Sequence, residues 1–187
     1  MQVVLLEDGY PCWLSMNELA DQAVACEAWQ PCLLSSSEIT SRLNTVLKWL
    51  QAAAGLNNTY LWGGTIGPDL DCSGLVQTAF ASTGIWLPRD AYQQERFCQP
   101  LAVQANDLNA LRSGDLIFFG TPERCTHVGI HLENGRYIHS SGIEHGRNGI
   151  GIDSLNPQDL HPVASHYRAE LRGAGRVTRC HDGSTLP

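Results

Sequence analysis

The chain has 187 residues, of which 43% are hydrophobic and 17% are charged, so it can bury a core and is not expected to be disordered. Twelve basic residues against 19 acidic ones give a formal net charge of −7. Because contact with phosphates needs a concentrated basic face, this balance excludes nucleic acid and anionic membrane surfaces as expected partners.

The N-terminal region begins with an apolar run at residues 3–6 that has no basic residue ahead of it. A secretory signal peptide needs a basic start and a longer apolar stretch, and a membrane span needs about 20 apolar residues, so neither is expected. The sequence by itself therefore predicts a cytoplasmic protein without a membrane partner. The rest of residues 1–34 shows short β-type runs separated by turn signals.

Two helices are expected next. Residues 35–55 carry an apolar stripe at helical spacing, with Ser35 and Glu38 as a capping box and Gly55 at the end. After a loop rich in Asn, Gly and Pro, the second helix is predicted to begin at Asp71.

The pattern changes after a third, shorter helix, which is expected from Leu87 with Pro88 in its first turn. Apolar and β-branched runs separated by Gly, Pro and Asn then predict strands at residues 115–119, 126–132, 136–141 and 150–153. Helices followed by an antiparallel sheet indicate the α+β class.

Seven cysteines are scattered along the chain without a C-x-x-C pair, which indicates reduced, mostly buried thiols and neither a disulfide framework nor a zinc site. Cys72 differs from the other six because it lies at the first turn of the second helix. Peptide dipoles and free N–H groups at a helix start favour a thiolate, lower the thiol pKa and can bind an oxyanion. The alternative is a small thiol packed against Leu75 and Val76.

A cysteine nucleophile needs a base, and the strand region supplies candidates. Alternation places His127, Gly129 and His131 on one face of their strand, and the Asn-Gly pair at residues 134–135 marks a hairpin. A two-residue loop would place His127 and His139 on opposite faces of the sheet. A three-residue loop with a left-handed glycine would place them on the same face, as diagonal neighbours within reach of one another.

The spacing of His127 and His131 also raises the possibility of a metal site, because two histidines four residues apart bind zinc on a helix. In a strand these positions are about 13 Å apart, which is too far to share one ion. The β-branched neighbours favour a strand, so we expect neither a metal nor an organic cofactor.

Six segments together resemble the NlpC-type bacterial cell-wall peptidases, which are cysteine enzymes with a papain-like α+β fold. The segments follow the family's order over nearly two thirds of the chain. They are Tyr60-Leu-Trp-Gly-Gly64, Asp71-Cys72-Ser73-Gly74-Leu75-Val76, Gly84-Ile-Trp-Leu-Pro-Arg89, Gly114-Asp-Leu-Ile-Phe-Phe119, His127-Val-Gly129 and Tyr137-Ile-His139-Ser-Ser141.

The resemblance implies that Cys72 is the nucleophile, His127 the general base and His139 the polar residue that orients the imidazole. Members of this kind cleave the bond after γ-linked D-glutamate in peptidoglycan stem peptides, before meso-diaminopimelate or Lys. The implied partner is therefore a peptidoglycan stem peptide.

Four further residues are candidates for substrate binding. Tyr60, Asp71 and Ser73 match positions that line the site, where an acidic residue can hold the free ammonium of an N-terminal L-Ala. Each also has a structural reading: Asp71 as the helix N-cap, Ser73 as part of that cap and Tyr60 as a packed ring. Arg89 fits a structural ion pair, and a carboxylate-rich substrate leaves a binding role open for it as well.

The resemblance also suggests three parts of the chain. Residues 1–34 resemble the last part of a bacterial SH3-like barrel, and they are too few to close that barrel. Residues 35–180 form the expected catalytic domain, with helices packed on an antiparallel sheet, and residues 181–187 form a C-terminal tail.

These observations predict a cysteine endopeptidase that hydrolyses the γ-D-glutamyl bond to the diamino acid, in the recycling of murein peptides. Two alternatives remain open at this stage. One is a thiol acyltransferase or amidase on the same fold, and the other is a peptidoglycan-binding module without turnover.

Overall fold

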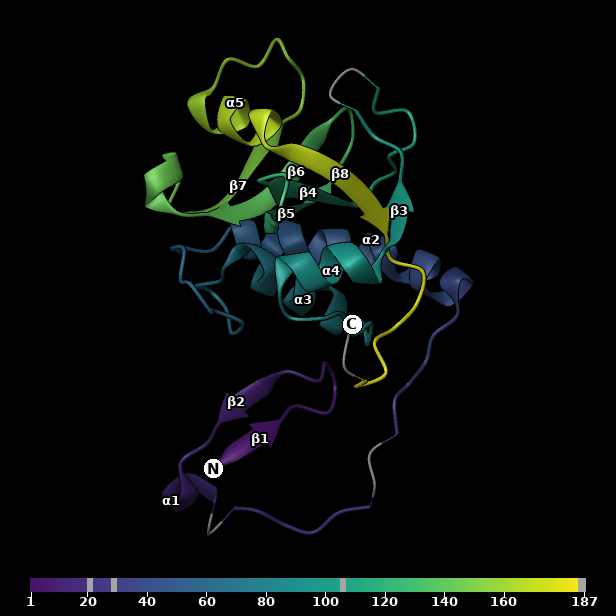
Figure 1. The fold of residues 1–187 in the computed structure, drawn as a ribbon, viewed down its shortest axis with the longest axis vertical. Helices are drawn as coiled ribbons and strands as arrows, with labels where there is room; N and C mark the ends of the chain where they lie inside the picture. Colours follow the sequence, from purple (N-terminus) through teal and green to yellow (C-terminus); the bar gives the residue numbers. More distant parts are fainter. Residues whose placement is uncertain (20–21, 28–29, 105–106, 185–187) are drawn as a thin grey trace.

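The computed structural model describes residues 1–19, 22–27, 30–104 and 107–184. Helices pack on an antiparallel sheet, so the predicted α+β class is confirmed (Figure 1). In chain order the elements are β1 (Gln2–Val4), β2 (Pro11–Trp13), α1 (Met16–Leu19), α2 (Ser36–Ala54), α3 (Cys72–Ala81), α4 (Ala91–Phe97), β3 (Gln99–Leu101), β4 (Leu116–Gly120), β5 (Cys125–His131), β6 (Arg136–Ser141), the 3-10 turn η1 (Ile143–His145), β7 (Gly149–Ser154), α5 (Pro162–Ala169) and β8 (Leu171–Arg176).

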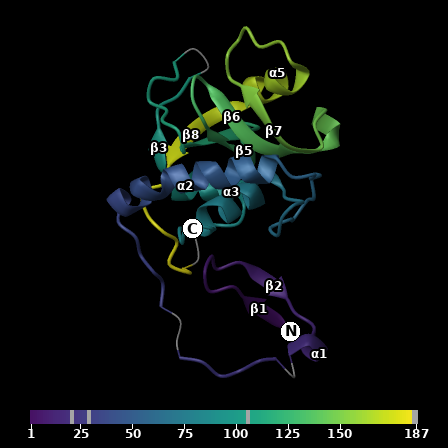
Figure 2. The same cartoon turned by 180° about the vertical axis from the view of Figure 1, so that it is seen from behind.

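The main sheet has the strand order β3-β8-β4-β5-β6-β7, and neighbouring strands run antiparallel. Helices α2, α3 and α4 lie against one face of this sheet, and α5 lies against the other (Figures 1 and 2). The last strand in the chain, β8, is inserted between β3 and β4, next to the edge strand β3.

Each face of the sheet has its own core. On the helix-rich face, α2 and α3 bury apolar side chains against Val128, Ile130 and Ile138 of the sheet. On the other face, Phe119 packs with Tyr167 of α5. Side chains alternate along a strand, so the β5 residues next to Val128 and Ile130 point to the opposite face of the sheet, toward α5. His127 lies on this face, where its ring stacks on Tyr167 of α5.

Helix α2 begins and ends where the sequence predicted. The Ser35 hydroxyl accepts a hydrogen bond from the Glu38 N–H, and the Glu38 carboxylate accepts one from the Ser35 N–H, which completes the capping box. Gly55 follows its last residue.

Other local predictions were wrong. Helix α4 begins at Ala91 with Asp90 as its N-cap residue, so Pro88 precedes the helix and is not in its first turn. Residues 16–19, expected to be β-type, form the short helix α1. No helix within the described ranges has both the length and the apolar character needed to cross a membrane.

The N-terminal segment forms a two-stranded hairpin, β1 and β2, below the main body in Figure 1. It contacts the body through its turn, where the Gln77 side-chain amide of α3 donates to the Asp8 carboxylate at 2.7 Å. The SH3-like assignment of residues 1–34 stays a prediction, and residues 20, 21, 28 and 29 of that segment lie outside the described residues.

The C-terminal tail is partly packed on the body. His181 is buried, and its N–H donates to the Trp86 carbonyl at 2.8 Å. The boundary at residue 180 stays a prediction, and residues 185–187 of the expected tail lie outside the described residues.

Candidate active site

Cys72 is the first residue of α3, and the loop before it is held tightly to the helix start. The Asp71 carboxylate caps the helix by accepting from the Gly74 N–H at 2.7 Å. A Cβ atom on Gly74 would collide with the Gly64 carbonyl, so only glycine lets the loop backbone approach this closely. The predicted helix start and N-cap are confirmed.

Burial controls the acidity of the Cys72 thiol. Burial, with a smaller contribution from the Asp71 carboxylate, raises the pKa of Cys72 to about 11, although the backbone N–H groups of Val128 and Ser73 oppose the rise. The expected lowering of the thiol pKa by the helix start is therefore wrong for the free protein. Loss of water around the sulfur outweighs the hydrogen bonds from these two N–H groups, so at neutral pH the thiol is protonated and needs a base.

Asp71 is also the centre of a buried ion pair. Arg89 makes a bidentate contact with its carboxylate, with distances of 3.1 and 2.6 Å, and also donates to the Ser73 hydroxyl at 2.9 Å. The Gly63 N–H donates to the second carboxylate oxygen at 2.8 Å. The structural ion pair predicted for Arg89 is confirmed, and the substrate-binding roles of Asp71, Ser73 and Arg89 stay predictions.

His127 and His139 lie on the same face of the sheet, as the three-residue loop predicted. The register pairs Ile130 with Ile138, and Gly135 has a left-handed backbone with φ of 71°. Nε2 of His127 and Nδ1 of His139 are 2.8 Å apart. A Cβ atom on Gly129 would lie 3.3 Å from the Cβ of His139, so this glycine leaves room for the second imidazole.

Asp153 is a further member of this row that the sequence prediction missed. It comes from β7, and its carboxylate lies 2.7 Å from Nε2 of His139. Arg147 donates to both of its oxygens, at 3.0 and 2.7 Å. Nothing in the sequence marks Asp153, because it lies beyond the matched motifs and reaches His139 only through the pairing of β6 with β7.

Both imidazoles are buried and neutral. Burial lowers the pKa of His127 well below its ordinary value, and the nearby His139 lowers it further. Burial likewise lowers the pKa of His139, although Asp153 acts in the opposite direction. His139 and Arg147 keep the pKa of Asp153 below its ordinary value against the effect of burial, so its carboxylate is ionised.

Tyr167 of α5 packs against the face of the His127 ring. The two rings stack with centroids 4.2 Å apart, and the Tyr167 hydroxyl is 2.7 Å from the Ser141 hydroxyl. Tyr167 was missed by the sequence analysis because α5 was not predicted. The position of the imidazole is therefore fixed from both sides, by His139 and by Tyr167.

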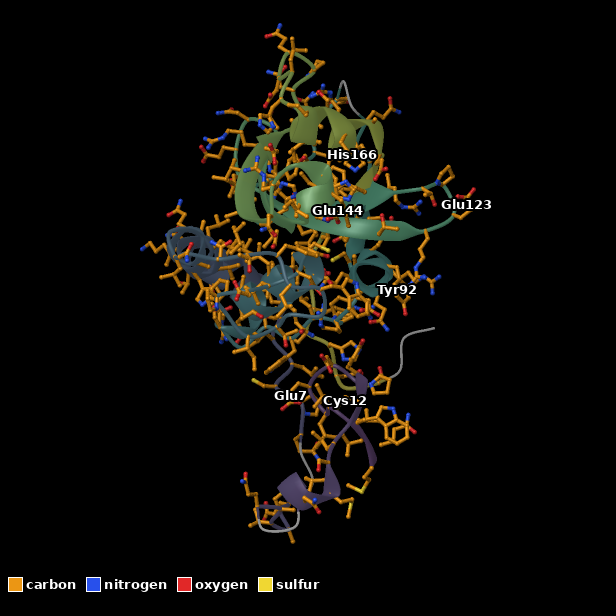
Figure 3. The ribbon with its side chains drawn as sticks, turned by 90° about the vertical axis from the view of Figure 1, so that its left-hand side faces the viewer. Glu7, Cys12, Tyr92, Glu123, Glu144 and His166 are labelled. Carbon is orange, nitrogen blue, oxygen red and sulfur yellow. The ribbon has the colours of Figure 1, made fainter. Side chains whose placement is uncertain are left out.

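Two adjoining cavities open onto these groups. The first, of about 390 Å³, is lined by Cys72 and by the Asp71 and Arg89 pair, and it extends to Tyr92. The second, of about 140 Å³, is lined by His127 and by residues that include Glu144 and His166. Figure 3 shows Tyr92 on the helix side, below Glu144 and His166 on the sheet side.

Tyr60 lies where the two cavities adjoin. Tyr60 and Thr126 line both of them, so the cavity of Cys72 and the cavity of His127 meet at these two residues, and we call the two cavities together the cleft. Burial raises the pKa of Tyr60, and the neighbouring Cys72 and Asp71 raise it further, so its hydroxyl stays protonated. The location predicted for Tyr60 is therefore correct, and its contact with a substrate stays a prediction.

The other described cysteines are free thiols in different surroundings. Cys98, Cys125 and Cys180 are buried, whereas Cys26 and Cys32 are exposed. Burial raises the pKa of Cys125 to about 12, and its thiol lies close to the backbone carbonyl of His127 and not to an imidazole. Cys72 is thus the described thiol that combines a helix start with a cleft shared with His127.

Across the described ranges, no group of three or more His, Cys, Asp or Glu side chains is arranged to hold a metal ion. The cleft contains a thiol and an imidazole, and a polar row extends from that imidazole through His139 to Asp153. Such an arrangement can carry out nucleophilic acyl transfer.

Comparison with known proteins gives the same family as the sequence motifs. The family model described as the NlpC/P60 family matches residues 57–168, which is more than half of the chain. A crystal structure of an NlpC/P60 family protein from Bacillus cereus superposes with a TM-score of 0.58 at 30% identity, over 73% of this chain and 40% of that one. This match confirms the papain-like α+β fold.

Two curated relatives have named activities. One is a gamma-D-glutamyl-L-lysine dipeptidyl-peptidase of Bacillus subtilis, 37% identical over 43% of this chain and 27% of its own length. The other is a murein DD-endopeptidase and murein LD-carboxypeptidase of Escherichia coli, 35% identical over 52% of this chain and 47% of its own length. The matched part of this chain thus spans about a quarter to half of these relatives. The motifs, the fold and the family match agree, and the chain belongs to the NlpC/P60 family.

Proposed function

We propose that the protein is a cysteine endopeptidase that hydrolyses the bond between γ-linked D-glutamate and the following diamino acid in peptidoglycan stem peptides. The observation that carries this proposal is the shared cleft of Cys72 and His127, with His139 bonded behind the imidazole at 2.8 Å. Hydrolysis of an amide by a thiol requires these three functions, namely a nucleophile, a base and a group that orients the base.

In the first step, the sulfur of Cys72 attacks the γ-carbonyl carbon of D-glutamate while His127 takes the thiol proton. The raised thiol pKa and the lowered imidazole pKa mean that the pair rests as thiol and neutral imidazole, and the proton moves during attack. The resulting imidazolium then gives this proton to the nitrogen of the leaving diamino acid. A water molecule activated by the same imidazole releases the acyl group from the sulfur.

The start of α3 supplies the group that stabilises the tetrahedral oxyanion. The Gly74 N–H is used by the Asp71 cap, whereas the backbone N–H of Cys72 has no hydrogen-bond acceptor among the described residues. A free N–H at a helix start is suited to an oxyanion because the peptide dipoles add to its positive charge. We assign this role to the Cys72 N–H.

The γ-D-glutamyl bond is supported by the relative named for a gamma-D-glutamyl-L-lysine activity. The second relative, named for DD-endopeptidase and LD-carboxypeptidase activities, makes other murein bonds the competing choice. Work in murein peptide recycling in the cytoplasm is part of the same proposal. It predicts a preference for short peptides that carry a free L-Ala amino group.

The test is hydrolysis of L-Ala-γ-D-Glu-meso-diaminopimelate, followed by chromatography of the products. We expect the wild type to release L-Ala-D-Glu and Cys72→Ala to release none. Cys98→Ala is the matched control, because Cys98 is also buried with a raised pKa and lies outside the cleft. Equal product from wild type and Cys72→Ala would exclude Cys72 as the nucleophile.

Three further substrates test the bond and the amino group. The same tripeptide with an acetylated amino terminus should be cleaved more slowly if recycling is the role. A peptide cross-linked between D-Ala and diaminopimelate should stay intact, and its cleavage in place of the tripeptide would favour the DD-endopeptidase. Replacing diaminopimelate with Lys reports which diamino acid is preferred.

The two remaining alternatives give different products. A thiol acyltransferase or amidase would form the same acyl-sulfur bond on Cys72, and added amine acceptors would then compete with water. A binding module would retain the tripeptide without product. Iodoacetamide should remove activity and EDTA should leave it intact, since the proposed reaction runs through a thiol.

A further inference from the structure

The row that starts at His127 continues past His139 to a buried carboxylate, which is paired with a partly exposed arginine. The carboxylate of Asp153 lies 2.7 Å from Nε2 of His139 and is 5% exposed. Arg147 contacts both carboxylate oxygens, and His161 approaches one of them at 3.7 Å. Three strands, β5, β6 and β7, thus contribute one polar side chain each to a continuous row.

The strand pairing leaves space for this row on both sides of His139. Gly151 of β7 lies directly opposite His139, and a Cβ atom there would collide with the Arg147 guanidinium. On the other side, Gly129 of β5 has the Cβ of His139 as its near neighbour. Two glycines flank one imidazole, so the ring and the guanidinium can both reach Asp153.

Hydrogen-bond chemistry then fixes where the protons are. An ionised carboxylate can only accept, so Nε2 of His139 carries a hydrogen and donates it to Asp153. A neutral imidazole with hydrogen on Nε2 has a bare Nδ1, which must accept at the 2.8 Å contact with His127. The hydrogen in that contact therefore belongs to Nε2 of His127, and Nδ1 of His127 is bare.

We propose that Asp153 is a positioning residue that orders both imidazoles, so that hydrogen bonds run from His127 through His139 to its carboxylate and leave Nδ1 of His127 to accept the Cys72 proton. This inference rests on the proposed function for its catalytic consequence. The order of the protons itself follows from the side-chain contacts together with the ionised carboxylate and the neutral imidazoles.

The surroundings keep the carboxylate in the form that the row requires. Arg147, His161 and His139 face it, and the Tyr137 ring lies against His139. Of these, Arg147 is a permanent cation, so the carboxylate stays ionised while His139 is neutral. When His127 takes the thiol proton, the negative charge at the end of the row stabilises the imidazolium through His139.

The first test reads the proton positions directly. In protein labelled with ¹⁵N-histidine, long-range ¹H–¹⁵N spectra at pH 7 should show hydrogen on Nε2 and a bare Nδ1 for both His127 and His139. The spectrum needs no substrate and no variant, so its outcome is independent of the proposed function. Hydrogen on Nδ1 of either ring in the wild type would overturn the inference.

The second test removes the charge of Asp153. Asp153→Asn should lower kcat on the tripeptide by about 10²–10⁴-fold with little change in KM, because an amide cannot stabilise the imidazolium. Asp115→Asn is the matched control. Asp115 is equally buried and is held by Arg176 at two 2.8 Å contacts, but its carboxylate contacts no imidazole.

A pH profile separates positioning from a loss of structure. Alkylation of Cys72 by iodoacetamide in Asp153→Asn should be slow at pH 7–8 and approach the wild-type rate above about pH 10, where the thiol ionises without a base. Asp153→Glu, which keeps the charge, should recover part of kcat. If Asp153→Asn has the same kcat as Asp115→Asn at pH 7, the inference about Asp153 fails, even when the wild type cleaves the tripeptide.

If the wild type does not cleave the tripeptide, the proposed function fails. The ¹H–¹⁵N spectra then still decide the order of the protons.

Discussion

Two buried aspartates, each paired with an arginine, lie on the two sides of the site and have different roles. On the helix side, the Asp71 carboxylate accepts from Arg89 and from the backbone N–H groups of Gly63 and Gly74. On the sheet side, Asp153 accepts from Arg147 and from an imidazole. The same chemical pair therefore anchors a loop and a helix start in one place and sets a proton position in the other.

This difference predicts whether a mutation changes mainly the free energy of unfolding or mainly the turnover. Removal of a partner from the helix-side pair leaves a buried charge beside backbone groups, so the cost falls on stability. Changes in the sheet-side row alter which nitrogen holds a proton, so the cost falls on turnover. The first two predictions below test the two halves of this contrast, and the others extend it to smaller effects.

The largest effect is expected at the imidazole next to the thiol. His127→Gln should lower kcat/KM for the tripeptide by about 10²–10⁴-fold, because the thiol of raised pKa then has no base. Steady-state kinetics at pH 7 measure kcat/KM, and urea unfolding checks that the variant is folded. Turnover within tenfold of the wild type would mean that another group takes the proton.

The next effect is on stability and on the helix side. Arg89→Met should lower the free energy of unfolding by about 3–5 kcal/mol, because it leaves the buried Asp71 carboxylate without its cation. Arg172→Met is the control, since the half-buried pair of Arg172 with Glu95 should be worth about 1 kcal/mol or less. Similar urea midpoints for the two variants would break the contrast.

A smaller effect tests the space beside His139. Gly129→Ala places a Cβ atom 2.9 Å from the Tyr137 ring and 3.3 Å from the Cβ of His139, so it should displace the second imidazole. We expect a loss of about 1–3 kcal/mol in stability together with reduced kcat. Gly173→Ala in β8 is the control, because nothing lies within 4 Å of its added Cβ. Unchanged kcat in Gly129→Ala would show that the imidazole tolerates a shift.

The pH dependence of stability follows from the two buried imidazoles. Both have lowered pKa values in the folded protein, and an unfolded histidine titrates near pH 6.5. As the pH falls from about 7 to 5, the unfolded chain takes up protons that the folded chain does not, so the free energy of unfolding should fall. Urea unfolding at both pH values measures this fall. His127→Gln combined with His139→Gln should flatten it, and an equally steep fall in that variant would assign the effect to other groups.

The smallest effect is expected at the edge of the first cavity. Asp90 lines this cavity beside Arg89 and makes no ion pair among the described residues, and burial raises its pKa. Asp90→Asn should raise KM for the tripeptide with a free amino group about 3–10-fold and leave kcat unchanged. The acetylated tripeptide is the control, since its KM should not respond. An equal rise in KM for both peptides would exclude a contact between the Asp90 carboxylate and the substrate ammonium.

Much of the site was predictable because it depends on local patterns. The capping residue of α3, the position of Cys72 and the shared face of His127 and His139 follow from helix caps, strand alternation and the length of one loop. The family motifs added roles for the same residues. Helix α5 and its Tyr167, by contrast, were missed, since no motif marked that segment.

The sequence by itself predicted a nucleophile and a base and offered the hairpin register that brings two histidines together, because each prediction depends on residues close along the chain. Tertiary structure alone decided the rest. Burial reversed the expected direction of the Cys72 pKa, and the pairing of β6 with β7 brought Asp153 to His139. The physical reason is that desolvation and cross-strand contact depend on what surrounds a side chain after folding, which its neighbours in sequence do not specify.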